Sequence, residues 1–180
     1  MAESSRDCSN PISADIPDWS REKPERFWDP PRKLLLSIRR YQHWKNKSGP
    51  VAGLISKFLV LRHRFWSVVT GAEIPLNCQI GGGLLILHPN GIVIHPDSII
   101  GVNCLILQQV TIGTHRRPGA PIIAGHVDIG AGAKVLGPVR IGAHVQIGAN
   151  AVVLSNVPDG ATVVGIPARQ IIPARSETSL

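Results

Sequence analysis

Large apolar residues in the first part of the chain follow the period of an α-helix. Residues 31–46 and 51–69 place them three and four positions apart, on one face of a helix. The stretch between these segments contains helix-breaking residues, and Gly71 follows the second one. Residues 1–30 are polar and contain four prolines. The pattern therefore predicts a flexible segment at 1–30 and a helical segment at 31–70.

After Gly71 the period of apolar residues becomes six. An aliphatic β-branched residue recurs from Ile100 to Ile112 and again from Ile123 to Val153, and the frame is lost over residues 114–122. Earlier members stand at Ile74, Ile80 and Ile86, followed by a slip of two residues to Ile94. The side chain two positions before most members is small or apolar, and glycine often follows.

Repeats of six residues are typical of a parallel β-helix. Each repeat is a short strand and a tight turn, and three repeats close one triangular coil in which equivalent aliphatic residues stack. An antiparallel sandwich would show a period of two instead. The 18 glycines and the aromatic content of 4% suit such thin layers. We predict an all-β core, a parallel β-helix of hexapeptide repeats, over residues 71–172 and a tail at 173–180.

Positive charge is concentrated in the helical segment. The formal net charge of the chain is +7, and residues 31–72 contain nine Lys and Arg and no Asp or Glu. This imbalance predicts a contact with an anionic partner or surface, such as a peripheral contact with a membrane, or a solvated basic face. We predict no nucleic-acid partner.

The three cysteines do not form a disulfide framework. Cys8, Cys78 and Cys104 are an odd number without close pairs, which indicates reduced thiols. Cys78 and Cys104 occupy repeat positions, so we expect them to pack in the core and not to act as nucleophiles. No secretory signal and no apolar run long enough to span a membrane is visible, so we expect a cytoplasmic protein.

Five segments together resemble the hexapeptide-repeat acyltransferases and, within them, the serine acetyltransferase family. The segments are GAEIPLNCQIGGGLLILHPNGIVI (71–94), LQQVTIG (107–113), VDIGAGAKVLG (127–137), IGANAVVLSNVP (147–158) and VVGIPAR (163–169). The resemblance covers about residues 58–172. It implies a left-handed coil, acetyl-CoA as co-substrate without a metal, and transfer of the acetyl group to a hydroxyl group.

The resemblance places the catalytic histidine on His88 and its acidic partner on Glu73, where the family usually has Asp. The slip between Ile86 and Ile94 marks the same place independently, because a break in the wall exposes side chains to a ligand. A neutral imidazole can take the proton of the attacking hydroxyl, and a carboxylate can fix its tautomer. The resemblance also makes the N–H of Gly113 a donor to the oxyanion. The alternative is that His88 caps a turn and Glu73 is a surface acid.

By resemblance, the coenzyme would lie along small residues of the later coils, with two basic residues near its phosphates. These candidates are Ala131, Gly132, Ala133, Gly148, Lys134 and Arg169. The acceptor site departs from the family. Leu87 replaces the Asp before the histidine, and Gly119 and Ala120 stand where the family has Arg–His. Candidate acceptor-binding residues are Asn90, His115, Arg116 and Arg117.

The acceptor is therefore either L-serine, as in the family, or a sugar hydroxyl of a surface polysaccharide or its precursor. Two rivals from other classes are a metalloenzyme resembling the γ-class carbonic anhydrases, which needs three converging histidines, and a non-catalytic scaffold. The family implies a homotrimer, and the helices could pair trimers into a hexamer. Because the chain ends on Leu180 and not on Ile, we do not predict the family's complex with the next enzyme of cysteine synthesis.

Overall fold

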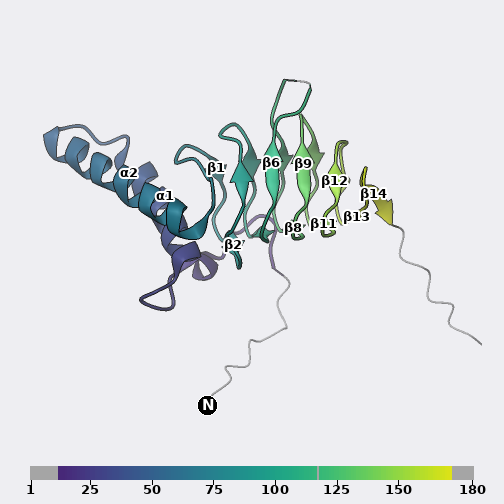
Figure 1. Ribbon diagram of the computed structural model, residues 1–180, viewed down its shortest axis with the longest axis horizontal. Coiled ribbons are helices and arrows are strands. Elements are labelled where there is room, and N and C mark those ends of the chain that lie inside the picture. The colour runs from purple at the N-terminus through teal and green to yellow at the C-terminus, as the bar shows by residue number, and fades with distance from the viewer. Residues whose placement is uncertain (1–11, 117, 172–180) are drawn as a thin grey trace, which may run out of the picture.

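The computed structural model describes residues 12–116 and 118–171, which form a helical part followed by a parallel β-helix (Figure 1). A short 3-10 helix, η1 (Trp19–Glu22), precedes the helices α1 (Pro30–Trp44) and α2 (Pro50–Thr70). The strands that follow are β1 (Gln79–Ile80), β2 (Leu85–Ile86), β3 (Val93–Ile94), β4 (Ile99–Ile100), β5 (Leu105–Ile106), β6 (Thr111–Gly113), β7 (Ile122–Ile123), β8 (Asp128–Ile129), β9 (Lys134–Leu136), β10 (Arg140–Ile141), β11 (Gln146–Ile147), β12 (Val152–Val153), β13 (Thr162–Val164) and β14 (Arg169–Ile171).

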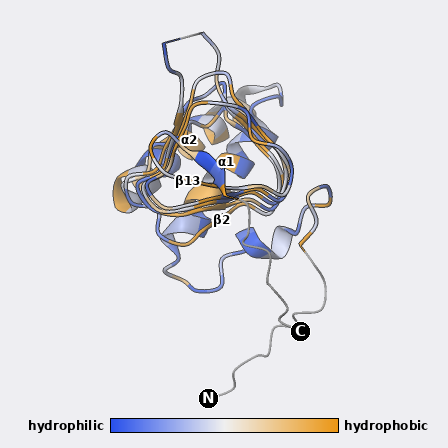
Figure 2. Ribbon diagram, turned by 90° about the vertical axis from the view of Figure 1, so that its right-hand side faces the viewer, coloured by the Kyte–Doolittle hydropathy of each residue, from blue (hydrophilic) through white to orange (hydrophobic). Residues whose placement is uncertain are grey.

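The strands form the three faces of a prism, which appears as a rounded triangle when viewed along its axis (Figure 2). The first face has the order β1-β4-β7-β10, the second β2-β5-β8-β11-β13-β14, and the third β3-β6-β9-β12. Equivalent repeat positions pair in register, as Ile94 with Ile112 and Ile106 with Ile129. All pairs are parallel except the last, where β14 runs antiparallel to β13 at the end of the prism.

The repeat positions fill the core, as the period of six predicts. Ile100, Ile106 and Ile112 are at most 1% exposed, and the smaller residues two positions before the repeat members, such as Cys104 and Ala133, are also buried. Burying one such isoleucine contributes about 2 kcal/mol. Cys78 and Cys104 are at most 1% exposed, which confirms that they pack in the core, and burial raises the pKa of both thiols to about 11. Cys8 lies outside the described residues.

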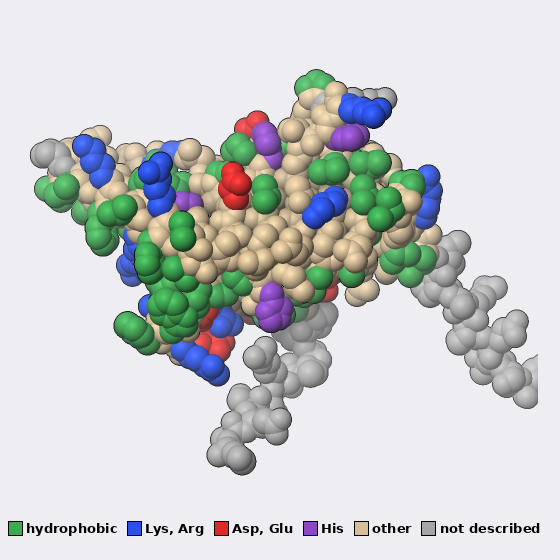
Figure 3. All heavy atoms as spheres, in the orientation of Figure 1, with side chains coloured by type: hydrophobic (Ala, Val, Ile, Leu, Met, Phe, Trp, Pro, Cys, Tyr) green, Lys and Arg blue, Asp and Glu red, His purple; other side chains and the backbone are tan. Residues whose placement is uncertain are grey.

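The two helices begin and end within two residues of the predicted bounds. They pack on one another, and the buried apolar residues include Leu34, Leu35 and Ile38 of α1 and Leu59 and Trp66 of α2. Leu54, Phe58, Leu61 and Phe65, whose spacing predicts α2, lie on its exposed side. The buried side is the one that carries Leu59 and Trp66. The exposed residues contribute to the hydrophobic surface at the helical end of the molecule (Figure 3).

Residues 13–22 contact the first coils of the β-helix. The flexibility predicted for residues 1–30 stays a prediction. Asn103 holds the segment with its side chain, which donates to the carbonyls of Ser13 and Ile16 and accepts from the N–H of Asp18 at 2.7–2.8 Å. Asn103 has a left-handed φ of 57° at a turn of the second coil. Its side-chain amide reaches the segment from this turn. Polar contacts to one distant asparagine leave no periodic trace in the sequence.

A buried ion pair joins the segment, α1 and the first coil. The Glu22 carboxylate accepts two hydrogen bonds from the Arg39 guanidinium, at 2.7 and 3.0 Å, and one from the N–H of Leu84. Arg39 also donates to the carbonyls of Ile80 and Gly81. Both side chains are thus satisfied, which is the condition for burying charge.

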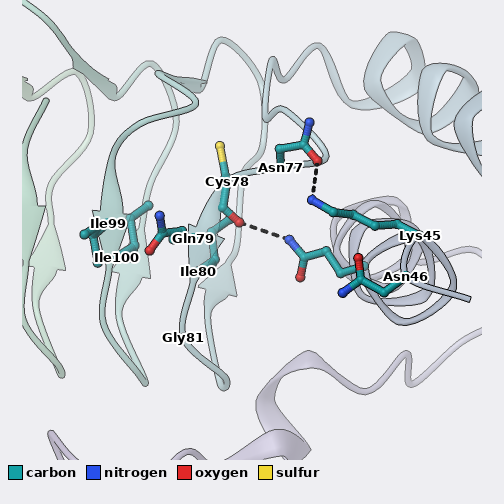
Figure 4. Close-up of a pocket in the computed structure, with 10 residues that line it drawn as sticks. Lys45, Asn46, Asn77, Cys78, Gln79, Ile80, Gly81, Ile99 and Ile100 are labelled. Carbon is teal, nitrogen blue, oxygen red and sulfur yellow. Dashed lines mark hydrogen bonds between the residues drawn. The ribbon is translucent and has the colours of Figure 1, made fainter.

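Gln42 of α1 and Lys45, which directly follows α1, also contact the first coil (Figure 4). The amide of Gln42 donates to the carbonyls of Leu76 and Cys78, and the Lys45 ammonium donates to Asn77. They line a groove of about 460 Å³ between α1 and the first face. The helical part is therefore anchored to the β-helix by polar contacts as well as by the shared core.

Candidate functional site

His88 lies on the edge of the prism between the second and third faces, which we call the His88 edge. This edge consists of the turns at 87–92, 107–110, 130–133 and 148–151. The turn that carries His88 is two residues longer than the others, because eight positions separate Ile86 from Ile94. The His88 ring is exposed there. The slip in the repeat thus corresponds to a longer turn at this edge of the prism.

Backbone hydrogen bonds stack the turns of this edge directly on one another. The N–H of Gln109 donates to the Asn90 carbonyl at 2.9 Å, and the N–H of Gly132 donates to the Gln108 carbonyl at 2.8 Å. The Gln109 amide also donates to the Asn90 side chain at 2.9 Å. Gln109 was not among the residues expected at the site. Its left-handed φ of 61° could have been suspected only from its alignment with Gly91 and Gly132 in the repeat.

Glu73 lies one coil before Val93 at the start of the third face. Its N–H donates to the Ile92 carbonyl at 2.7 Å, and its own carbonyl accepts from Ile94 at 2.9 Å. The carboxylate is exposed and forms no hydrogen bond or ion pair with His88. The backbone of Glu73 is thus held by the coil that follows it, near the His88 edge, and the side chains of Glu73 and His88 are both exposed.

Glu73 also lines a cavity of about 730 Å³ beneath α2. His63, Arg64 and Ser67 of α2 share this cavity, and none of them was expected at the site. The His63 ring is mostly buried, with Nδ1 3.2 Å from the Ser37 hydroxyl, and burial lowers the pKa of His63. Only the packing of α2 on the first coil brings these polar side chains to Glu73.

The expected coenzyme residues lie on the later coils, most of them along the His88 edge. Ala131 and Gly132 form the third turn of that edge, and the Lys134 ammonium donates to the Gln109 carbonyl beside it. Gly148 lines a groove of about 370 Å³ on the second face. Arg169 is exposed on β14, at the end of the same face. The Ala133 side chain points into the core, so this residue offers a ligand only its backbone.

The loop after β6 lies at the opposite edge of the third face. His115 and Arg116 line a cavity of about 530 Å³ there, and Gly113 ends the strand that leads into the loop. A Cβ at Gly113 would meet nothing within 4 Å, so the space in front of it is open. Because all strands of this face are parallel, one chain does not bring the loop together with His88 or Asn90. Arg117 lies outside the described residues.

Two histidines form a pair elsewhere on the β-helix. The Nδ1 atoms of His126 and His144 are 2.7 Å apart at the edge between the first and second faces. Burial is the main cause that lowers the pKa of His126, and the nearby Asp128 opposes it. Among residues 12–116 and 118–171, no group of three or more His, Cys, Asp or Glu side chains could hold a metal ion, and this pair has no third ligand.

The chain is similar to serine acetyltransferases from several organisms. It is 49% identical over 107 residues to the enzyme of Synechococcus elongatus, a match that covers 58% of this chain and 44% of the relative. It is 38% identical over 135 residues to that of Mycobacterium tuberculosis, with coverages of 73% and 57%. The chain thus spans about half the length of the curated relatives it matches. No family model matches it.

Solved structures of serine acetyltransferases have the same fold. One in complex with CoA superposes with a TM-score of 0.68 at 33% identity, over 81% of this chain and 58% of that one. The soybean enzyme complexed with serine gives 0.67 at 32% identity, over 79% and 57%. These matches confirm the left-handed parallel β-helix preceded by helices. In sequence and in fold, the matched part of this chain is therefore similar to the hexapeptide-repeat serine acetyltransferases.

Proposed function

We propose that this chain transfers the acetyl group of acetyl-CoA directly to an acceptor hydroxyl, with His88 as the general base. The observation that carries the proposal is the position of His88 on a longer turn, on the same edge as the small residues expected to border the coenzyme. Similarity to acetyltransferases, one solved with CoA and one with serine, supports the same chemistry.

In this mechanism the neutral His88 ring takes the hydroxyl proton as the oxygen attacks the thioester carbonyl. A Glu73 carboxylate on the other ring nitrogen would fix the tautomer and stabilise the imidazolium. Catalytic hydrogen bonds often tighten only when substrates bind, so the lack of a hydrogen bond between these two exposed side chains is compatible with this role. The C–S bond then breaks, and the thiolate of CoA takes the proton from His88. The alternative, His88 as a turn residue and Glu73 as a surface acid, predicts no effect of either on turnover.

The coenzyme would run along the His88 edge. Adjacent coils are about 4.8 Å apart, so the turn of Ala131 and Gly132 lies roughly 10 Å from the turn of His88. Small side chains there would let an extended chain approach the backbone closely. Lys134 and Arg169 supply positive charge for phosphates at the far end.

The site would be completed between two copies of the chain. The His88 edge and the loop of His115 and Arg116 lie at opposite edges of one face, so a trimer of prisms would place the edge of one copy against the loop of the next. Gly113 would then donate to the oxyanion across this interface. A test is to co-express His88→Ala chains with Arg116→Ala chains. Recovery of activity in mixed trimers supports a shared site. If the mixed trimers recover no activity, the site lies within one chain.

Two acceptor classes remain as proposals, and L-serine is the one named in the relatives. A sugar hydroxyl is the second candidate, because Leu87 places a half-exposed apolar side chain beside His88 and the loop carries the uncharged Gly119 and Ala120. A zwitterionic amino acid requires an acid and a base at its two charged groups. An acceptor screen that follows the free thiol released from acetyl-CoA separates the two. Robust turnover of L-serine at sub-millimolar KM would exclude the sugar proposal.

A further inference from the structure

An apolar stripe covers the outer side of α2. Its six members alternate in spacing between three and four positions, so they lie on one face of the helix. All are more than half exposed: Val51, Leu54, Phe58, Leu61, Phe65 and Val68. Leu59 and Trp66, on the adjacent side of the helix, are buried. We call these six residues the α2 stripe. A contiguous exposed apolar surface of this kind marks an interaction site.

Aromatic side chains extend the stripe beyond α2. The Phe65 ring contacts that of Trp66 at 5.0 Å between centroids, and Trp66 contacts Trp28 at 5.7 Å. Trp28 is 60% exposed and the neighbouring Phe27 is 89% exposed. The surface at this end of the molecule shows hydrophobic side chains beside basic ones (Figure 3). Exposed Trp and Phe beside an apolar helix face are typical of side chains that enter the interfacial layer of a bilayer.

The charged side chains of α2 itself are all basic. Lys57 and Arg64 are exposed and seven positions apart, and both lie within one helical turn of Leu61. On the neighbouring helix, Arg40 lies close enough to Arg62 to lower the pKa of Arg62 further, beyond the larger effect of burial. Residues 31–72 contain no Asp or Glu that could neutralise these groups. These basic side chains, which form the basic border of the stripe, repel the same side chains of a second copy and attract an anionic lipid surface.

We propose that the α2 stripe and its basic border dock this protein onto the surface of an anionic membrane, with α2 lying in the interfacial plane. In the part of the chain that the structure describes, none of the helices could span a bilayer. The proposed contact is with the membrane surface. The apolar face enters the boundary between headgroups and acyl chains, while Lys57 and Arg64 contact lipid phosphates. The proposal does not depend on the acetyl transfer proposed above.

The test is flotation of the purified full chain with vesicles of phosphatidylcholine alone or mixed equally with phosphatidylglycerol. We expect binding to the anionic vesicles, weaker binding to neutral ones, and release by high salt. Lys57→Gln should weaken binding to anionic vesicles about five-fold, and Lys57→Gln with Arg64→Gln roughly 30-fold. Arg140→Gln, which removes an exposed basic residue of the β-helix, is the matched control and should change nothing.

The apolar contribution has its own variant. Phe58→Ser should weaken binding to both kinds of vesicle by about ten-fold or more, whereas Ile166→Ser, an equally exposed apolar residue at the far end of the β-helix, should not. Both sites are on the surface, and unchanged thermal unfolding verifies the fold. The proposal is overturned if wild-type protein ignores anionic vesicles or if Phe58→Ser leaves its binding intact. It is also overturned if Phe58→Ser instead dissociates an oligomer in solution, which would make the stripe a contact between copies.

Discussion

Neutralising Glu22 should destabilise the protein much more than neutralising Glu25, although both carboxylates pair with an arginine of α1. The Glu22 side chain is 8% exposed and its Arg39 partner 20%, and this guanidinium also donates to two backbone carbonyls. Glu25 is 60% exposed and pairs with Arg32 at 3.0 Å. Glu22→Gln keeps the shape of the side chain and removes its charge, so Arg39 stays largely buried without a counter-ion.

The magnitude follows from burial. Removing one partner of a buried pair costs about 3–5 kcal/mol, and the residual exposure and remaining carbonyl contacts of Arg39 reduce this to about 2–3 kcal/mol. An exposed pair contributes below about 1 kcal/mol, which sets the expectation for Glu25→Gln. For a domain of this size, the Glu22 variant should lower Tm by about 5–10 °C.

The assay is urea unfolding at one fixed protein concentration, with thermal unfolding as a second measurement. Fixed concentration matters because an oligomer couples stability to assembly. The reasoning predicts a clearly lower midpoint for Glu22→Gln and an almost unchanged one for Glu25→Gln. If the two variants unfold within about 0.5 kcal/mol of each other, the Glu22–Arg39 contact does not anchor the helical part as described.

Three further predictions concern the core, the thiols and pH. Ile112→Ala should cost about 3–4 kcal/mol in urea unfolding because the side chain is fully buried, whereas Ile99→Ala, 37% exposed, should cost about 1 kcal/mol; similar losses would contradict the stacked core. In a Cys8→Ser background, Cys78 and Cys104 should react with iodoacetamide at least about 100-fold more slowly than in urea, because burial raises the pKa of both thiols to about 11; fast native labelling would refute their burial. The folded-state pKa of His126 is lowered, mainly by burial, so its neutral form stabilises the fold above the unfolded pKa of about 6.5, and that stability is lost as the pH falls. His126→Asn, which tolerates the left-handed backbone, should therefore narrow the difference in Tm between about pH 7.5 and pH 5.5, and an unchanged difference would assign the acid sensitivity to other groups.

The sequence predicted the β-helix closely because its signal is repeated. Each coil places aliphatic residues at equivalent positions, so every repeat between Ile100 and Val153 predicts the same strand and the same buried position. The bounds of α1 and α2 were predicted within two residues for the same reason, since a helix face repeats its spacing. Periodicity did not say which face of α2 is buried. That depends on where α1 lies, and the face of Leu59 and Trp66 is covered while the equally apolar face of Phe58 is not.

The candidate site was predicted less completely. The break in the repeat located His88, because a change of two residues in a strict period is visible without a structure. His63 and Arg64 beside Glu73 were missed, because helix packing alone brings them there. The contacts of residues 13–22 with Asn103 and Arg39 were not predicted, because single polar contacts between distant residues leave no trace in composition or periodicity.

The central claim is that His88 acts as the base in acetyl transfer to a hydroxyl. Its most direct test is the rate of thiol release from acetyl-CoA by wild type and by His88→Ala, each with the best acceptor found among L-serine and saccharides, with His95→Ala as the matched control. The account predicts that His88→Ala lowers kcat by at least about 100-fold with unchanged thermal unfolding, and that His95→Ala keeps most of the activity. Wild-type turnover by His88→Ala would contradict it.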